Sequence, residues 1–290
     1  MARIEKLVIV GVGLIGGSFA LALKGAGAVG RVVGVGRGAQ NIRRALDLKI
    51  IDDAGALDPA TLADADLVLL AVPVGQMQPV MRSIAPLLGV RTVVTDAGST
   101  KQDVVELARR ELKGSLSRFV PGHPIAGTEK SGAEAAFAEL YRGRKVVLTP
   151  LRDNDPGAIA LVRSAWESCG ADVFEMKPKE HDAVLATVSH LPHLLAYALV
   201  DLVAGRKNAT QLFSFAAGGF RDFTRIASSH PEMWRDICLA NREALLVELN
   251  RYGAGLDKLR TALKRGDART LDKLFSGARD ARNRWLEDGE

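Results

Sequence analysis

A single histidine stands in a stretch of the sequence that is rich in proline and glycine, residues 119–129. Pro121, Gly122 and Pro124 surround His123. Proline lacks a backbone N–H and glycine loosens the chain, so this stretch predicts a loop. An imidazole titrates close to neutral pH, which makes His123 a candidate proton acceptor. A lone loop histidine is more often a surface residue, and the surrounding fold has to decide between the two interpretations.

A glycine-rich segment lies between a β-branched run at 6–10 and a helical pattern at 19–24. In a G-x-G-x-x-G segment placed in this way, Gly11 makes the turn, Gly13 admits a pyrophosphate and Gly16 packs helix on strand. The start of the helix adds N–H donors for phosphate, and a purely structural turn is the alternative. The residues expected to bind the cofactor here are Gly11, Gly13, Leu14, Ile15 and Gly16.

The second expected strand, residues 31–35, ends without an acidic residue. A dinucleotide fold that prefers NAD carries Asp or Glu at this point to bind the ribose hydroxyls. Gly36 and Arg37 stand there instead, and a guanidinium suits a 2′-phosphate. We therefore expect NADP, or both cofactors, unless Arg37 only points into solvent.

Two more strands should end at the same edge of the sheet, where ligands bind in such folds. The apolar run 66–72 ends at Val72 and Pro73, which we expect to contact the cofactor. The run 90–95 leads to Ser99, ahead of a helix expected at 102–112. Ser99 is therefore a candidate for the site, although it could equally cap that helix.

The pattern becomes helical from residue 180 to the end. We expect an α/β fold with two domains, a Rossmann-type dinucleotide-binding domain at 1–178 and an all-helical substrate and dimerisation domain at 179–290. The helix expected at 180–203 is apolar nearly all round and should be buried. Burial against a second copy of the chain is the simplest way to achieve this, which predicts a homodimer.

The helical half contains further polar candidates. His190 and His193 share a helix face around Pro192, which should disturb the helix, and each could also be an ordinary core histidine. Two histidines without a cysteine or carboxylate beside them make a poor metal site, so no metal is expected. Gly218 precedes two arginines at helical spacing, Arg221 and Arg225, which could bind a carboxylate or form ordinary ion pairs.

Composition excludes several classes of protein. Of the 290 residues, 47% are hydrophobic and 25% charged, as in a soluble globular protein. The net charge of +5 suggests anionic partners, either nucleic acid or small phosphorylated or carboxylated ligands. Aromatic residues make up only 5%, which argues against a base-stacking surface, so we expect small ligands and no nucleic acid. Cys169 and Cys238 are isolated, and glycines interrupt the apolar segment 7–23, so neither disulfides nor a signal peptide are expected. We find no segment that should span a membrane, and we expect a cytoplasmic protein.

These motifs together resemble the prephenate and arogenate dehydrogenases of tyrosine biosynthesis, over nearly the whole chain. The resemblance rests on the glycine loop, Asp96-Ala-Gly-Ser-Thr-Lys101, Gly122-His-Pro-Ile-Ala-Gly-Thr128, Ser189-His-Leu-Pro-His193, Gly218-Gly-Phe-Arg-Asp-Phe-Thr-Arg225 and Pro231-Glu-Met-Trp234.

The resemblance implies an oxidative decarboxylation of a cyclohexadienol that needs NAD or NADP and no metal. His123 would accept the hydroxyl proton, Ser99 would hydrogen-bond the same hydroxyl and orient His123, and Arg225 would bind the ring carboxylate. The other residues expected around the substrate are His190, His193, Trp234, Thr128, Glu129, Arg221 and Gly218.

Three points stay open at this stage. The sequence does not choose between prephenate and arogenate, and tyrosine feedback, if it occurs, would act by competition at the active site. A β-hydroxyacid dehydrogenase would need a catalytic lysine, for which only Lys207 is a loose candidate. A non-catalytic NADP-binding protein is the alternative from another class.

Overall fold

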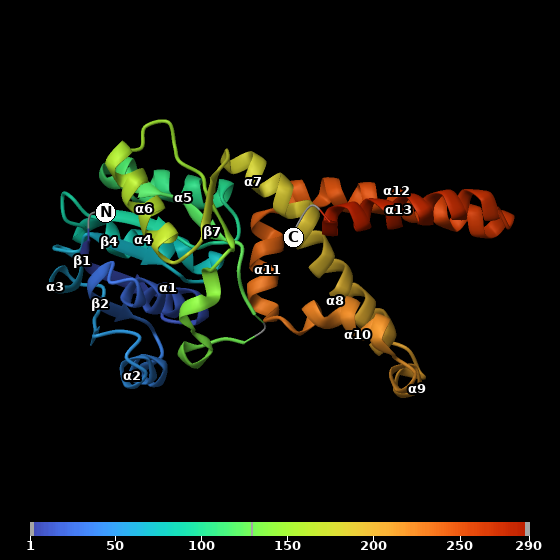
Figure 1. Ribbon diagram of the computed structural model, residues 1–290, viewed down its shortest axis with the longest axis horizontal. Coiled ribbons are helices and arrows are strands. Elements are labelled where there is room, and N and C mark those ends of the chain that lie inside the picture. Colours follow the sequence, from blue (N-terminus) through green and yellow to red (C-terminus); the bar gives the residue numbers. More distant parts are fainter. Residues whose placement is uncertain (1–2, 129, 288–290) are drawn as a thin grey trace. The chain divides into compact units, whose positions relative to one another are not determined.

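The computed structural model describes residues 3–128 and 130–287 (Figure 1). The chain divides into two compact units, Met1–Arg242 and Glu243–Glu290. The first unit holds all the described strands and the helices up to α11. The second holds most of α12 (Arg242–Arg265) and α13 (Ala268–Glu287), joined at Gly266. The predicted boundary of the functional domains at residue 178 stays a prediction.

A six-stranded parallel sheet forms the centre of the first unit. Its strand order, β3-β2-β1-β4-β5-β6, is that of a doubly wound dinucleotide-binding fold, as the sequence predicted. The strands are β1 (Ile4–Val10), β2 (Val29–Val35), β3 (Asp53–Ala54), β4 (Leu67–Leu70), β5 (Val93–Asp96) and β6 (Phe119–Val120).

Alternating side chains of β1 show why this sheet is buried on both faces. Leu7 and Ile9 pack into one core with helices α1 and α6, whereas Val8 and Val10 pack into a second core with α4 and α5. Successive side chains of a strand point to opposite faces, so an apolar residue at every position indicates two covered faces. The helices around the sheet are α1 (Leu14–Gly25), α2 (Ala39–Asp47), α3 (Pro59–Leu62), α4 (Met77–Ile84), α5 (Gln102–Glu111) and α6 (Pro156–Ser168).

His123 lies on a strand, contrary to the predicted loop. It belongs to β7 (Gly122–Pro124), which pairs antiparallel with β8 (Lys145–Leu148) in a second sheet of order β7-β8-β9. The proline pattern misled because β7 is only three residues long and Pro124 is its last residue. A strand with one neighbour tolerates proline at its end. The third strand is β9 (Asp172–Glu175).

The expected long helix after residue 180 consists of three segments, α7 (Pro178–Leu185), the π-helical turn η6 (Ala186–His190) and α8 (Leu191–Ala204). Pro192 has no N–H to offer the carbonyl four residues earlier, so the helix widens to an i+5 pattern before it. The segments that follow are α9 (Ala209–Ser214), α10 (Gly218–Thr224), η7 (Arg225–Ser228) and α11 (Pro231–Ala240).

The helical run Pro178–Ala204 departs from two expectations. By length and composition it could cross a membrane, whereas no such segment was expected; core helices of soluble proteins can also meet this criterion. Only 28% of its most apolar window is buried, so the single chain as described does not provide the burial that its composition predicted. Its polar side chains His181, Asp182 and His190 are nevertheless buried.

Substituting Gly16 should destabilise the fold. A Cβ at Gly16 would lie 2.4 Å from the Gly11 carbonyl oxygen and 2.7 Å from a methyl group of Ile9. Gly16→Ala should therefore lower the free energy of unfolding by about 1–3 kcal/mol, measured by urea denaturation. Gly13→Ala is the matched control, because its Cβ would meet no protein atom within 4 Å. Equal stability of the two variants would contradict this account of helix packing.

Candidate active site

The glycine loop has the shape that a dinucleotide requires. Gly11 has φ +102°, and a Cβ there would collide with the Ala71 carbonyl and contact Val72, so the turn lies directly against the end of β4. Gly13 precedes α1, and the space around its Cβ position is open on the protein side. The first turn of α1 has no acidic residue to repel an anion. These features fit a pyrophosphate at the helix start.

The other predicted cofactor positions lie at the same edge of the sheet. Leu14 and Ile15 begin α1, and the Ile15 carbonyl accepts a hydrogen bond from Tyr141 at 2.6 Å. Gly36 and Arg37 follow β2, and both are exposed. Within the described residues Arg37 has no hydrogen-bond or ion-pair partner, which leaves its guanidinium available to a ligand. Val72 and Pro73 follow β4.

His123 is connected to a carboxylate through a second histidine. Its Nδ1 lies 2.8 Å from Nε2 of His181, whose own Nδ1 lies 2.8 Å from Oδ1 of Asp182. Asp182 also accepts from the backbone N–H groups of Lys101 and Gln102, at 2.8 and 2.9 Å, and so caps α5 from another helix. All three side chains are buried. The result is a continuous histidine–histidine–carboxylate chain between β7 and α7.

A buried ion pair lies beside this chain. Lys101 and Asp96, both 0% exposed, are hydrogen-bonded to each other, and the Lys101 ammonium also donates to the Gly122 carbonyl at 2.8 Å. Asp96 accepts in turn from the backbone N–H groups of Gly98 and Gly122. The pair therefore fixes the backbone on the N-terminal side of His123 to the end of β5.

The surroundings of His123 disfavour its charged form. Burial lowers the pKa of His123 well below its usual value, and positive charge on His181, Lys101 and His190 would lower it further. Burial likewise lowers the pKa of His181, against the opposing effect of Asp182. Although burial opposes it, the hydrogen bonds from His181 and the backbone keep the pKa of Asp182 below its ordinary value. At neutral pH the site therefore contains neutral imidazoles and an ionised carboxylate.

His190 and His193 lie in the same part of the structure. The Asn241 amide nitrogen bonds both to the Asp182 carbonyl, at 2.8 Å, and to Nδ1 of His190, at 3.0 Å, which connects His190 to the histidine chain. His193 stacks on Trp234, with ring centroids 3.5 Å apart. Trp234 in turn packs with Val74, directly after Pro73, so α11 meets the cofactor edge of the sheet.

The remaining predicted residues are less tightly connected. Ser99 is half-buried and makes no side-chain hydrogen bond within the described residues; the Nδ1 partner of His123 is His181. Gly218 and Arg221 are exposed on α10, and Arg225 begins η7, both of which pack on α8. Thr128 accepts from the Lys130 N–H at 3.2 Å, and Glu129 lies outside the described residues.

Sequence reasoning missed four residues of this site, namely His181, Asp182, Lys101 and Asn241. The adjacent His-Asp pair at the start of an apolar helix was the signal that could have found two of them, because polar residues in such a run need partners. Lys101 and Asn241 carried no such signal, since each stands in an ordinary polar context.

Comparisons with known proteins show the family of this chain. Residues 19–175 match the model of the prephenate dehydrogenase nucleotide-binding domain, and residues 177–277 match that of the prephenate dehydrogenase dimerization domain. The chain belongs to the prephenate dehydrogenase family. It is 39% identical to the cyclohexadienyl dehydrogenase of Zymomonas mobilis, over 97% of this chain and 96% of that protein.

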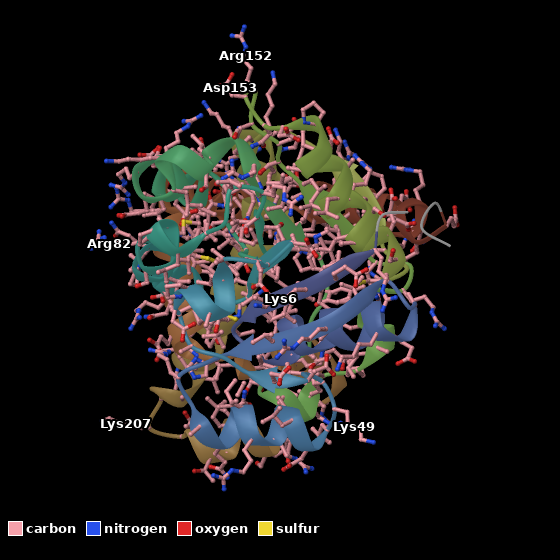
Figure 2. The ribbon with its side chains drawn as sticks, turned by 90° about the vertical axis from the view of Figure 1, so that its left-hand side faces the viewer. Lys6, Lys49, Arg82, Arg152, Asp153 and Lys207 are labelled. Atoms are coloured by element: carbon pink, nitrogen blue, oxygen red, sulfur yellow. The ribbon has the colours of Figure 1, made fainter. Side chains whose placement is uncertain are left out.

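Solved structures of the family have the same fold. The Aquifex aeolicus prephenate dehydrogenase, in complex with hydroxyphenyl propionate and NAD+, superposes with a TM-score of 0.89 at 38% identity, covering 97% of this chain and 98% of that one. Synechocystis arogenate dehydrogenase gives 0.81 at 31% identity, covering 97% and 100%. The hydroxyacid dehydrogenase alternative is not favoured, and Lys207 is exposed on the segment between α8 and α9 (Figure 2).

The neutral histidines should make stability depend on pH. The pKa of His190 is lowered to about 4, mainly by burial, whereas the pKa of an unfolded histidine is near 6.5. As pH falls between these values only the unfolded state gains the proton, so the free energy of unfolding should decrease, by about 3 kcal/mol for this residue.

Denaturant titrations at several pH values between 7 and 4 check this expectation. His190→Asn should have a shallower pH slope than the wild type, by about one proton at most. Val188→Asn, at an exposed position of the same turn, should keep the wild-type slope. An unchanged slope in His190→Asn would contradict the assignment of a neutral His190.

Proposed function

We propose that this protein catalyses the NAD(P)-dependent oxidative decarboxylation of prephenate, arogenate or both. The observation that carries the proposal is the buried, neutral His123, whose Nδ1 is bonded to His181 while Nε2 has no partner among the described residues. A relative acts on cyclohexadienyl substrates, and others are prephenate and arogenate dehydrogenases. We propose that the protein works in the cytoplasm, as expected for a biosynthetic enzyme.

The chemistry needs one base and a correctly placed carbon. The substrate ring carries a hydroxyl and a hydrogen on C4 and a carboxylate on the opposite carbon. The nicotinamide of the cofactor is the acceptor of the hydride from C4. Nε2 of His123 takes the hydroxyl proton. Loss of carbon dioxide then leaves an aromatic phenolate, and His123 returns the proton to its oxygen. A weak base suffices, because the hydroxyl becomes strongly acidic as the hydride leaves.

The other site residues are assigned to binding. Arg225 pairs with the ring carboxylate, because a guanidinium binds a carboxylate through two parallel hydrogen bonds. Ser99 hydrogen-bonds the substrate hydroxyl. The residues that shape the rest of the pocket and its entrance are His190, His193, Trp234, Thr128, Glu129, Arg221 and Gly218.

Turnover assays test both the reaction and the role of His123. Reduced-nicotinamide absorbance is measured with prephenate or arogenate against NAD or NADP. At least one combination should be active, and His123→Asn should lower kcat about 10²–10⁴-fold in it, because the proton acceptor is lost. Turnover that survives this substitution would disprove the assignment of the base, and four silent combinations with intact cofactor binding would disprove the proposed function.

Cofactor choice is assigned to the end of β2. We propose that Arg37 binds the 2′-phosphate of NADP and that Gly36 removes the carboxylate which would repel it. A hydrogen bond to a charged group contributes about 1.5–3 kcal/mol, so Arg37→Ala should raise KM for NADP about tenfold or more and leave KM for NAD nearly unchanged. Arg43→Ala, on the exposed side of α2, is the control. An equal effect on both cofactors would refute this role.

We propose that the protein is a homodimer that buries its helical half. The exposed apolar side chains of the first unit support this, among them Leu202 on α8, which is 58% exposed. Light scattering should give about twice the chain mass of 31.0 kDa. Leu202→Glu should weaken association about tenfold or more, whereas Lys179→Glu, on α7, should not. A monomeric wild-type protein would contradict the proposal.

A further inference from the structure

The histidine chain ends on a group that can only accept hydrogen bonds. Asp182 is ionised, and its Oδ1 lies 2.8 Å from Nδ1 of His181. The backbone N–H groups of Lys101 and Gln102 also donate to this carboxylate, so three donors surround it. An ionised carboxylate has no proton to give. Nδ1 of His181 must therefore carry the proton of that bond.

This assignment passes along the chain to His123. Neutral His181, protonated on Nδ1, has a lone pair on Nε2, and Nε2 is the atom that contacts Nδ1 of His123. His123 must then donate from Nδ1, which leaves a lone pair on its own Nε2. The free Nε2 is the atom that the proposed reaction needs as proton acceptor. The opposite order of protons would put a hydrogen on that atom and block it.

We propose that His181 and Asp182 are positioning residues that hold His123 in the tautomer with its proton on Nδ1. The inference rests on the proposed function only for its effect on catalysis. His181 also stabilises His123 after proton transfer, because the His123 imidazolium still donates from Nδ1 to Nε2 of His181. A hydrogen-bonded carboxylate fixes the tautomer of a histidine in this way in other enzymes.

The charged groups around the chain agree with a neutral His181. Lys101 disfavours a second positive charge, and Asp96 compensates Lys101 directly. Asp182 favours charge on His181, but burial outweighs it. His190 is hydrogen-bonded through Asn241 to the Asp182 carbonyl, and it too is neutral at pH 7. A cationic His181 would reverse the bond to His123.

Asp182 itself is a poor site for the test. An asparagine there would turn an NH₂ group toward at least one of the donors from His181, Lys101 and Gln102, so α5 would lose part of its cap whichever way the amide lay. Loss of activity in such a variant would not separate positioning from folding. Among the described residues, the His181 side chain makes two hydrogen bonds, to His123 and to Asp182, so it is the better position to substitute.

The first experiment is ¹⁵N NMR of the histidine-labelled full-length protein at pH 7.5, in which protonated and lone-pair nitrogens resonate in separate regions. His123, assigned by comparison with His123→Asn, should carry its proton on Nδ1. A proton on Nε2 in the wild type would overturn the proposal. This measurement needs no turnover, so it stands even if neither prephenate nor arogenate is a substrate.

The second experiment compares two substitutions at His181. His181→Leu removes the acceptor, so kcat should fall about 10–100-fold with KM and cofactor affinity nearly unchanged, and the His123 spectrum should change to the other tautomer or a mixture. His181→Gln keeps an acceptor oxygen, so it should bring kcat back to within a few-fold of the wild type and return the His123 proton to Nδ1. Glu180→Gln, exposed on α7, is the matched control. Wild-type kcat and tautomer in His181→Leu would overturn the proposal, as would a failure of glutamine to restore either.

Discussion

The site depends on one buried carboxylate. The Asp182 carboxylate accepts a hydrogen bond from His181 and two from the backbone N–H groups at the start of α5. The backbone carbonyl of Asp182 accepts a further hydrogen bond from the Asn241 amide. A buried charge is costly unless it is hydrogen-bonded, and three donors reach this carboxylate: His181 Nδ1 and the backbone N–H groups of Lys101 and Gln102. Removing one of these donors would leave the buried carboxylate with two hydrogen bonds instead of three. β7, the start of α5 and α7 are therefore held in one arrangement.

Much of the cofactor half could be predicted from local patterns. β-branched runs identified the parallel strands, and the glycine spacing identified the turn at Gly11 and the close approach at Gly16, because both follow from backbone geometry within a few residues. The placement of His123 on β7 was missed because pairing with β8 is a non-local contact. The prolines around His123 indicate where backbone hydrogen bonding between strands must end, but not whether a short strand forms there.

The polar network behind His123 was not predictable in the same way. His123 and His181 are 58 positions apart in the chain, and Lys101 and Asp182 are 81 apart. Periodicity describes what one helix or strand presents, and it contains no information about which buried polar groups meet. The apolar run after residue 178 even favoured full burial, whereas in the single chain only 28% of its most apolar window is buried. Its buried polar residues connect it to the first unit's α/β part: His181 bonds to His123 on β7, and Asp182 bonds to the start of α5.

Gly36, the exposed glycine after β2, differs from the glycines of the Gly11–Gly16 loop in what a side chain would meet there. At Gly11 and Gly16 an added Cβ would collide with backbone, whereas at Gly36 it would meet two side-chain carbons of Ile42, Cδ1 at 3.0 Å and Cγ1 at 3.4 Å. That end of a flexible side chain can move. A glycine codon becomes an aspartate or glutamate codon by one nucleotide change. One mutation can therefore place a carboxylate at this position, and the atoms that it displaces belong to the flexible side chain of Ile42 rather than to backbone.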